Sequence, residues 1–381
     1  MLRATTYCAP RLQRFFSSPR SKAVEKLLQK NLDDVVITLA LRTPLTRGNK
    51  GGLKDTSADS LLYGMLKAVQ ERSGVDPAMV EDITTGVCHS PSPTYEARAA
   101  ALAAGFPQHV PVQSINRLCS SGLMAVRSIS DSISRGDIQV GLAVGYESMS
   151  TNPRPTPVFK HPDINANNLS RDCAQPMGWT SENVATDFNI SREAMDEYAG
   201  TTEEGLAKLK SAFPNWGDGR STAGNSSPIT DGAAAVMLMT RQKAEELGLE
   251  ILARHVNTVV TGVPPRHMGV GPAFAIPKVL SKTGLSMEDV DLFEINEAFA
   301  SMMVYTIDKL QVPLDKLNVN GGAIALGHPL GCTGARQIAT GLSELKKRDG
   351  NVLVTSMCIG SGMGAAAVFV RESTGTTASK L

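Results

Sequence analysis

One cysteine of this chain, Cys119, lies where a strand is expected to turn into a helix, within the segment NRLCSSGL at 116–123. A strand is predicted at 110–115, and apolar residues at three- and four-residue steps predict a helix that ends near Gly136. A thiol at a helix start faces free backbone N–H groups and the positive end of the helix dipole, which favour the thiolate. Because a thiolate attacks carbonyl carbon, Cys119 is a candidate nucleophile, although an isolated cysteine is more often a small residue of the core.

Three further turns carry side chains of chemical interest, and each follows a predicted strand. The segment FEINEAF at 293–299 holds Asn296, which could also be the ordinary N-cap of the next helix. In NGGAIALGHPLGCTGAR at 320–336, glycines surround His328, a setting that suits a functional histidine better than core packing. In CIGSGMG, glycines follow Cys358 and would let a ligand contact backbone N–H groups. Two cysteines, one histidine and one asparagine in such turns predict a single reactive site.

Buried strands that alternate with helices must position these turns. This alternation argues for an α/β layered fold with a largely parallel sheet, whose ligands bind where strands run into helices. Beyond the elements that flank Cys119, strands are predicted at 35–41, 82–87, 139–145, 231–239 and 362–370, and helices at 60–70, 98–105 and 300–310.

The chain also repeats itself. GDIQVGLAVG is echoed by DGNVLVTSM, and DGAAAVMLM by GMGAAAVFV, in the same order along the chain. This predicts an internal duplication, two similar α/β halves with a boundary near Arg241. From Thr151 the chain is rich in proline and asparagine and poor in apolar runs, which predicts an inserted loop domain.

Composition excludes several classes of protein. The 381 residues are 42% hydrophobic and 5% aromatic, with 38 basic against 37 acidic side chains, so no charge bias favours nucleic acid. The six cysteines form no CxxC pair and no cluster with histidine, which suggests neither a metal site nor a disulfide framework. We expect a soluble globular protein, because no apolar run approaches the length of a membrane span.

Both ends of the chain resemble targeting signals. Residues 1–30 form a targeting-like segment whose first 24 residues are basic, rich in serine and free of acids, as in a mitochondrial transit peptide. The other end is a polar tail, 372–381. Its last three residues are Ser379, Lys380 and Leu381, the tripeptide recognised by the peroxisomal import receptor. The tripeptide depends on its position, whereas basic N-termini are common, so we predict a peroxisomal protein, with the mitochondrion as the alternative.

Taken together, these segments resemble the thiolase family, and in particular its peroxisomal 3-ketoacyl-CoA type. The blocks NRLCSSGL, GYESMS, PMGWTSENVA, MGVGPAFAIP, FEINEAFAS, GGAIALGHPLGCTGARQ and CIGSGMGAA look like the family's signatures, in the family's order. The resemblance implies the thiolase fold, a five-layered α-β-α-β-α arrangement of two duplicated halves, usually as a homodimer. We expect the halves at 31–241 and 242–371, with the loop domain at about 151–229.

The resemblance also implies thiolysis of 3-ketoacyl-CoA by CoA, through an acyl-cysteine intermediate and without metal or redox cofactor. Cys119 would be the acyl-accepting nucleophile, and His328 would lower its thiol pKa or take its proton. Cys358 would be the general acid/base, Asn296 would hold a water, and the backbone N–H of Gly360 would help bind the oxyanion. Further residues would bind CoA or line the acyl channel: Ser227, Met177 and Phe299.

The chain departs from the family pattern in one large respect. Between Gly200 and the helix-like segment 205–213, thiolases have a few dozen further residues that help to grip CoA. Smaller departures are Met302, where glutamine is expected, and Pro228, where glycine is expected. The alternatives are therefore an active thiolase, including an acetoacetyl-CoA thiolase, and a thiolase-fold binding or dimerisation partner without turnover.

Two other enzyme classes fit the same residues less well. A cysteine protease built from Cys119, His328 and Asn296 would leave Cys358 and the duplicated halves unexplained. Decarboxylating ketoacyl synthases resemble thiolases in fold but have a second histidine in the place of Cys358.

Overall fold

The computed structural model describes residues 20–200, 205 and 208–372. The terminal tripeptide 379–381, most of the N-terminal targeting-like segment and the junction at 201–204 lie outside these residues. Within the described part, no helix is both long enough and apolar enough to cross a membrane.

Each half of the chain contributes a set of strands. The first set comprises β1 (Val35–Arg42), β2 (Thr46–Arg47), β3 (Asp82–Gly86), β4 (Val112–Ile115), β5 (Val140–Ser148) and β6 (Thr230–Thr240). The second set comprises β7 (Ala253–Gly262), β8 (Leu292–Ile295), β9 (Val352–Ile359) and β10 (Met363–Val370).

The strands follow one hydrogen-bonded path in the order β4-β3-β5-β6-β1-β7-β10-β9-β8. In the first half, β4, β3 and β5 are parallel, while β6 is antiparallel to both β5 and β1. In the second half, β8 and β9 are parallel, while β10 is antiparallel to both β9 and β7. The strands β3-β5-β6-β1 and β8-β9-β10-β7 therefore share order and direction, as the internal duplication predicts, whereas β4 has no counterpart among the strands described in the second half.

The prediction of a largely parallel sheet is wrong, because the sheet is mixed. A tight turn joins β9 to β10, and strands joined in this way must be antiparallel. Strands buried on both faces read as continuous apolar runs whatever their direction, so the sequence pattern did not distinguish the two cases.

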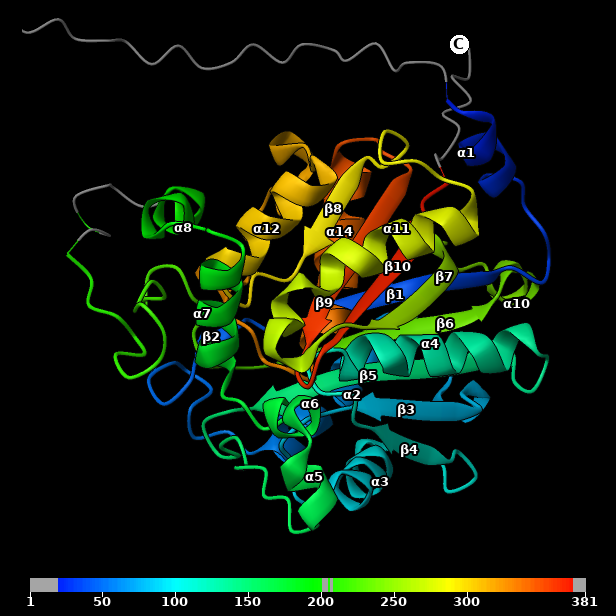
Figure 1. Ribbon diagram of the computed structural model, residues 1–381. Helices are drawn as coiled ribbons and strands as arrows, with labels where there is room; N and C mark the ends of the chain where they lie inside the picture. Colours follow the sequence, from blue (N-terminus) through cyan, green and yellow to red (C-terminus); the bar gives the residue numbers. More distant parts are fainter. Residues whose placement is uncertain (1–19, 201–204, 206–207, 373–381) are drawn as a thin grey trace, which may run out of the picture.

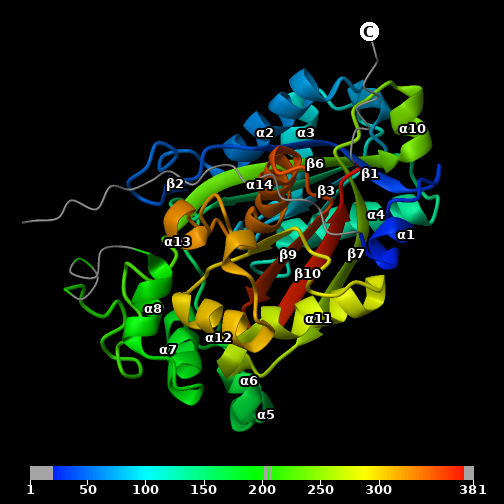
Figure 2. The same cartoon turned by 90° about the horizontal axis from the view of Figure 1, so that it is seen from above.

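Helices form three layers around the two sets of strands (Figures 1 and 2). In the first half, α2 (Ala58–Ser73) and α3 (Pro93–Ala104) cover the outer face of the sheet. Between the two sets of strands lie α4 (Ser121–Ser134) and α14 (Thr333–Lys347). The outer face of the second half is covered by α11 (Gly271–Thr283) and α12 (Ala300–Leu310). This is the expected α-β-α-β-α arrangement.

Successive residues of the central strands face different helix layers, as the pleat of a strand requires. In β6, Val236 packs in the central cluster with α4 and α14, whereas Met237 packs with α2 and α3. In β10, Ala367 faces the central helices and Val368 faces α11 and α12. The central strands of both halves are thus held between two packed helix layers.

Short helices lie at the margins of the core: α1 (Lys22–Leu27), α5 (Pro162–Ala166), α6 (Asn168–Asp172), α7 (Met177–Asp187), α8 (Arg192–Ala199), α10 (Arg241–Glu246) and α13 (Ala323–Leu326). Of these, α5–α8 belong to the inserted region; in Figure 1, α7 and α8 lie to the left of the core and α5 and α6 lie below it. Its own small cluster, including Val184 and Met195, packs against Val270 and Ala300 of the second half.

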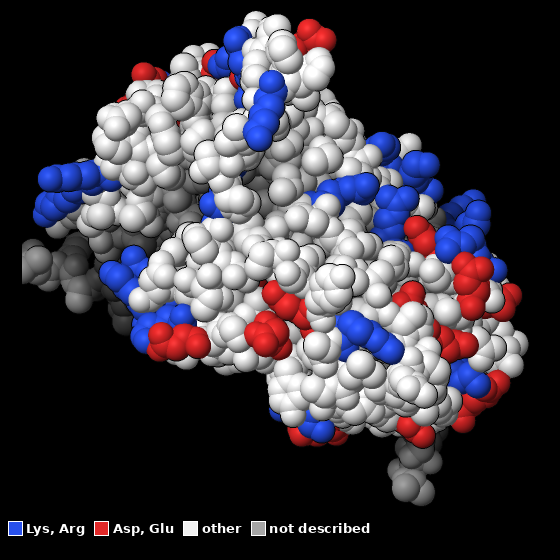
Figure 3. Space-filling view, turned by 90° about the horizontal axis from the view of Figure 1, so that it is seen from below, with Lys and Arg blue, Asp and Glu red and all other residues white. Residues whose placement is uncertain are grey.

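The helix expected at 205–213 is not formed over 208–213, where the chain makes turns and an isolated bridge between Ser211 and Thr222. Gly217 and Gly219 both have left-handed backbone conformations and reverse the chain between the bridged residues. Figure 3 shows basic and acidic side chains interspersed on one face of the molecule, in keeping with the near-zero net charge.

Candidate active site

The turn between β4 and α4 presents Cys119. Leu118, directly before it, has a left-handed backbone conformation with φ 49°, which is rare for a residue with a branched side chain. Asn116 holds this turn from both sides: its side-chain oxygen accepts the N–H of Leu118 at 2.9 Å, and its amide donates to the carbonyl of Cys88 at 2.9 Å. Strain of this kind persists only where the surroundings fix it, and it is typical of functional turns.

The environment of the Cys119 thiol is more apolar than the sequence predicts. The backbone N–H groups of Gly360 and of Cys119 itself hydrogen-bond to the sulfur and favour the thiolate, as expected. Burial outweighs them and raises the pKa of Cys119 to about 11. The prediction that the helix start alone favours the thiolate is therefore wrong for the resting protein, whose thiol must lose a proton before it can attack.

The tight turn between β9 and β10 brings Gly360 and Cys358 beside the nucleophile. Cys358 is fully buried, and its sulfur lies 3.5 Å from the sulfur of Met302 in α12. Burial, together with the nearby Cys119, raises the pKa of the Cys358 thiol well above its usual value. Cys358 is therefore a neutral thiol, which is the form that can give a proton.

His328 is a neutral base with a defined tautomer. Its Nδ1 lies 2.6 Å from the hydroxyl oxygen of Thr333, and that hydroxyl donates its single proton to the carbonyl of Pro329 at 3.0 Å. The imidazole must therefore carry its proton on Nδ1, which leaves Nε2 as the acceptor. Burial lowers the pKa of His328 to about 3, so the ring is uncharged at neutral pH.

Asn296 lies in the turn between β8 and α12, but it is not a helix cap, because the N-cap of α12 is Phe299. Its side-chain amide donates to Nε2 of His328 at 3.3 Å. The other side-chain atom, Oδ1, is buried and has no hydrogen-bond partner among the described residues. A buried acceptor left open in this way suits a bound water or a substrate group, which favours the functional interpretation.

The structure thus joins the predicted residues in two groups, Cys119 with Gly360 and Asn296 with His328. Within the described residues, neither Cys119 nor Cys358 hydrogen-bonds directly to the imidazole of His328. Catalytic hydrogen bonds are often long in unliganded proteins and shorten when substrate binds.

The predicted substrate-binding residues lie around the same turns. Both the N–H and the hydroxyl of Ser227 donate to the carbonyl of Ala298, at 3.0 and 3.1 Å. Phe299 is buried, and its ring contacts the ring of Phe213. Met177 begins α7, and its sulfur lies 3.7 Å from the position that a Cβ on Gly360 would occupy.

Two residues that hold this site were not singled out from the sequence, Asn116 and Thr333. Both lie inside the motifs that carry Cys119 and His328, so the motifs gave their position but not their role. Their contacts depend on how the turns close in space.

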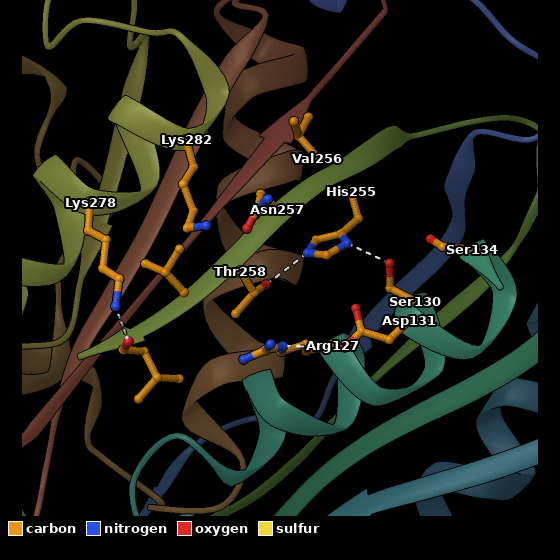
Figure 4. A pocket seen from close by; sticks show the side chains of 12 residues that line it. Arg127, Ser130, Asp131, Ser134, His255, Val256, Asn257, Thr258, Lys278 and Lys282 are labelled. Carbon is orange, nitrogen blue, oxygen red and sulfur yellow. Dashed lines mark hydrogen bonds and ion pairs between the residues drawn. The ribbon is translucent and has the colours of Figure 1, made fainter. Parts of the chain in front are cut away.

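Apart from these turns, a polar pocket of about 410 Å³ lies between α4, β7 and α11 (Figure 4). Its buried histidine, His255, forms two hydrogen bonds: Nδ1 lies 2.6 Å from the hydroxyl oxygen of Ser130, and Nε2 lies 2.8 Å from that of Thr258. Burial lowers the pKa of His255 to about 4, so it too is neutral. None of the predicted site residues lines this pocket, and its histidine links α4 of the first half to β7 of the second.

Comparison with known proteins agrees with the geometry. Residues 249–371 match the family described as "Thiolase, C-terminal domain", and residues 35–201 and 199–242 match "Thiolase, N-terminal domain". The chain belongs to the thiolase family.

A peroxisomal 3-ketoacyl-CoA thiolase B of Candida tropicalis is 44% identical to this thiolase over 413 residues, covering 95% of this chain and all of the relative. The crystal structure of the dimeric peroxisomal thiolase of Saccharomyces cerevisiae superposes with a TM-score of 0.86 at 42% identity, covering 91% of this chain and 100% of that one. A second structure of the yeast protein is described as five-layered and built from two core domains of identical topology. Human mitochondrial 3-ketoacyl-CoA thiolase in complex with CoA is 34% identical, with a TM-score of 0.81 over 90% of this chain and 99% of that one.

The comparisons also locate the missing segment. The Candida alignment has 413 positions, whereas 95% of 381 residues is about 362, so about 50 positions have no residue of this chain. The two matched parts of the N-terminal domain meet at 199–201, where the sequence predicts the gap.

Proposed function

We propose that this thiolase cleaves 3-ketoacyl-CoA with CoA to acetyl-CoA and a shortened acyl-CoA, the last step of fatty-acid β-oxidation. Thiolysis breaks a carbon–carbon bond, so it needs a nucleophile and a separate acid for the departing enolate. The observation that carries the proposal is the presence, in the turns of one chain, of two buried neutral thiols that interact with each other, Cys119 and Cys358, and of a neutral imidazole whose Nε2 is an acceptor.

In the first half-reaction, the thiol proton of Cys119 passes to Nε2 of His328, and the sulfur attacks the 3-keto carbon. The N–H groups of Cys119 and Gly360, which lie at the sulfur in the free protein, stabilise the oxyanion. The C2–C3 bond then breaks, its electron pair forms the acetyl-CoA enolate, and the Cys358 thiol protonates C2.

The enolate oxygen carries the developing charge in this step. His328, now protonated on Nε2, can donate to that oxygen, and so can a water held by the open Oδ1 of Asn296. One imidazole therefore first accepts the proton of the nucleophile and then stabilises the enolate.

In the second half-reaction, the Cys358 thiolate takes the thiol proton of CoA. The CoA thiolate attacks the acyl-cysteine, the acyl group moves to CoA, and His328 returns its proton to Cys119. Both thiols and the imidazole end in their starting forms. Ser227, Met177 and Phe299 lie at these turns and would contact CoA or the acyl chain.

Steady-state thiolysis tests the proposal. Purified protein is mixed with free CoA and either acetoacetyl-CoA or a longer 3-ketoacyl-CoA, and the loss of enolate absorbance is followed. An acyl-enzyme mechanism predicts parallel lines in double-reciprocal plots. Comparing the two substrates also separates a broad 3-ketoacyl-CoA thiolase from one restricted to acetoacetyl-CoA.

The shortened inserted region supports a second candidate, a thiolase-fold partner that binds without turnover. About 50 aligned positions of the Candida relative have no residue of this chain, and the match to the N-terminal family domain is broken at 199–201, in the region expected to bind CoA. A folded protein without thiolysis would favour this candidate. Turnover with a raised KM for CoA would mean that CoA binding is weakened but not abolished.

We further propose a homodimer in the peroxisome. Dimerisation is supported by the dimeric yeast homologue, and the location by the peroxisomal relative. Ser379, Lys380 and Leu381 would be read by the import receptor. A fluorescent fusion at the N-terminus, with and without this tripeptide, would test the location.

A further inference from the structure

A buried carboxylate that the proposed reaction does not use, Glu147 at the end of β5, connects the two halves of the site. Its side chain is fully buried. It accepts the backbone N–H groups of Cys88 at 2.9 Å and His89 at 3.0 Å, which follow β3 in the first half. It also accepts the N–H of Gly331 at 2.9 Å, three residues after His328 in the second half. A carboxylate is buried at high cost unless its oxygens are hydrogen-bonded, so these three donors matter to the fold.

Gly331 itself is inserted deeply into the first half. A Cβ at this position would lie 2.6 Å from Cα of Val87 and 2.7 Å from the carbonyl oxygen of Tyr146. Conversely, a Cβ on Gly122 or on Gly145 would lie 2.5 Å from the carbonyl oxygen of Gly331. Four close approaches of this kind leave the turn no room to shift without a rearrangement of its neighbours.

The contacts of Glu147 continue to the nucleophile on the other side. Cys88 donates its backbone N–H to the carboxylate of Glu147. The carbonyl oxygen of Cys88 accepts a hydrogen bond from the side-chain amide of Asn116 at 2.9 Å. Asn116 in turn accepts the N–H of Leu118 at 2.9 Å and so holds the strained turn before Cys119. A continuous path of hydrogen bonds therefore runs from the turn of the base to the turn of the nucleophile, with Glu147 at its centre.

We propose that Glu147 is a positioning residue, which binds the turn of His328 to the strand ends beside Cys119 and thereby sets the imidazole relative to the thiol. The inference rests on the proposed function, because it assigns Glu147 to the geometry of that reaction. It also gives a role to a buried carboxylate in a site whose proposed reaction uses no acidic side chain.

The charge of Glu147 gives this role a signature beyond folding. The Glu147 carboxylate raises the pKa of Cys119, while the positive charge of Arg154 lowers it. Burial raises the pKa of Glu147 itself to about 7, against the opposing effect of its three N–H donors. The titratable side chains that interact electrostatically with it are Cys88, Glu96, Cys119, Tyr146 and Cys332.

The test compares Glu147→Gln with wild type and with Glu96→Gln. Glutamine removes the charge of Glu147 and can accept through only one of its two polar atoms, so the three N–H groups are no longer all bound. We expect kcat for thiolysis to fall about 10- to 100-fold, because a misplacement of about 1 Å at a catalytic group can cost about 100-fold in rate. Glu96 interacts with the same carboxylate but donates nothing to the path, so Glu96→Gln should retain turnover within about twofold.

Alkylation of Cys119 by iodoacetamide supplies the second readout. Removing the negative charge of Glu147 should lower the pKa of Cys119 and move the pH profile of alkylation to lower pH. Turnover should thus fall while alkylation at pH 8 accelerates. Because unfolding would also expose the Cys119 thiol and speed its alkylation, both rates are measured on protein that thermal unfolding shows to be folded. Glu147→Asp keeps the charge but is shorter by one methylene, so it should lose turnover and keep the alkylation profile of wild type.

Two results would overturn the inference: a folded Glu147→Gln variant with turnover within twofold of wild type, or an unchanged alkylation profile in that variant. If Glu147→Gln fails to fold, the aspartate variant decides, and wild-type turnover in it would overturn the inference. Absence of thiolysis in the wild type would instead contradict the proposed function, and the alkylation profiles alone would then decide.

Discussion

Replacing Thr333 by valine tests the assigned tautomer of His328. Valine matches the shape of threonine but has no hydroxyl, so Nδ1–H of the imidazole would lose its acceptor at 2.6 Å. Thr333 is fully buried, which leaves no solvent to replace the lost partner. The buried N–H would then be unsatisfied in every state of the reaction.

The effect on rate follows from the charge that His328 gains during attack. A hydrogen bond contributes about 0.5–1.5 kcal/mol when neutral and about 1.5–3 kcal/mol when one partner is charged. The bond from Nδ1 to Thr333 is therefore worth about 1–2 kcal/mol more once Nε2 has taken the thiol proton. Since 1.36 kcal/mol corresponds to a tenfold rate, kcat should fall roughly 5- to 30-fold.

The assay is steady-state thiolysis by wild type, Thr333→Val and the matched control Thr333→Ser. Serine keeps the hydroxyl and its bond to the carbonyl of Pro329, so its kcat should stay within about threefold of wild type. Thermal unfolding of all three proteins separates loss of fold from loss of rate. Equal kcat values for the valine and serine variants would refute the tautomer and the role of His328 as proton acceptor.

Three further outcomes are expected. Cys358→Ala should abolish turnover while Cys119 still reacts with iodoacetamide, and unaltered turnover would contradict the role of Cys358 as acid. Burial raises the pKa of Cys119 to about 11, so alkylation of this thiol in the free protein should accelerate about tenfold per pH unit from pH 7 to 9. A plateau in the alkylation rate below pH 8 would contradict the buried environment of the thiol. Arg336 pairs with Glu294 at 3.0 Å with both side chains buried, so Arg336→Met should lower the free energy of unfolding in urea by about 3–5 kcal/mol, and a loss below 1 kcal/mol would show that the pair is not essential.

Much of the fold could be predicted from the sequence. Continuous apolar runs located β1, β5, β6 and β10, and the echoed segments gave two halves that share strand order and direction. Strand direction could not be predicted, because β6 and β10 are buried on both faces and read like parallel strands. Their direction depends on which strands they pair with, and that is set by contacts distant in sequence.

The reactive turns could be predicted because glycines and reactive side chains occur together in the sequence, directly after predicted strands. The contacts between turns could not. Asn296 has the same sequence context as a helix cap, and only the packing of the turns places its amide on His328. Likewise, the helix start predicts a stabilised thiolate at Cys119, but burial outweighs it, and how deeply the thiol is buried cannot be read from its own motif.

The acyl-cysteine intermediate is the central claim, and it can be trapped directly. The protein is incubated with acetoacetyl-CoA in the absence of free CoA, digested and analysed by mass spectrometry. We predict one acetyl group on the peptide that contains Cys119, and its release as acetyl-CoA when CoA is added. No adduct, or an adduct on Cys358 that CoA discharges, would contradict the assignment of Cys119 as the nucleophile.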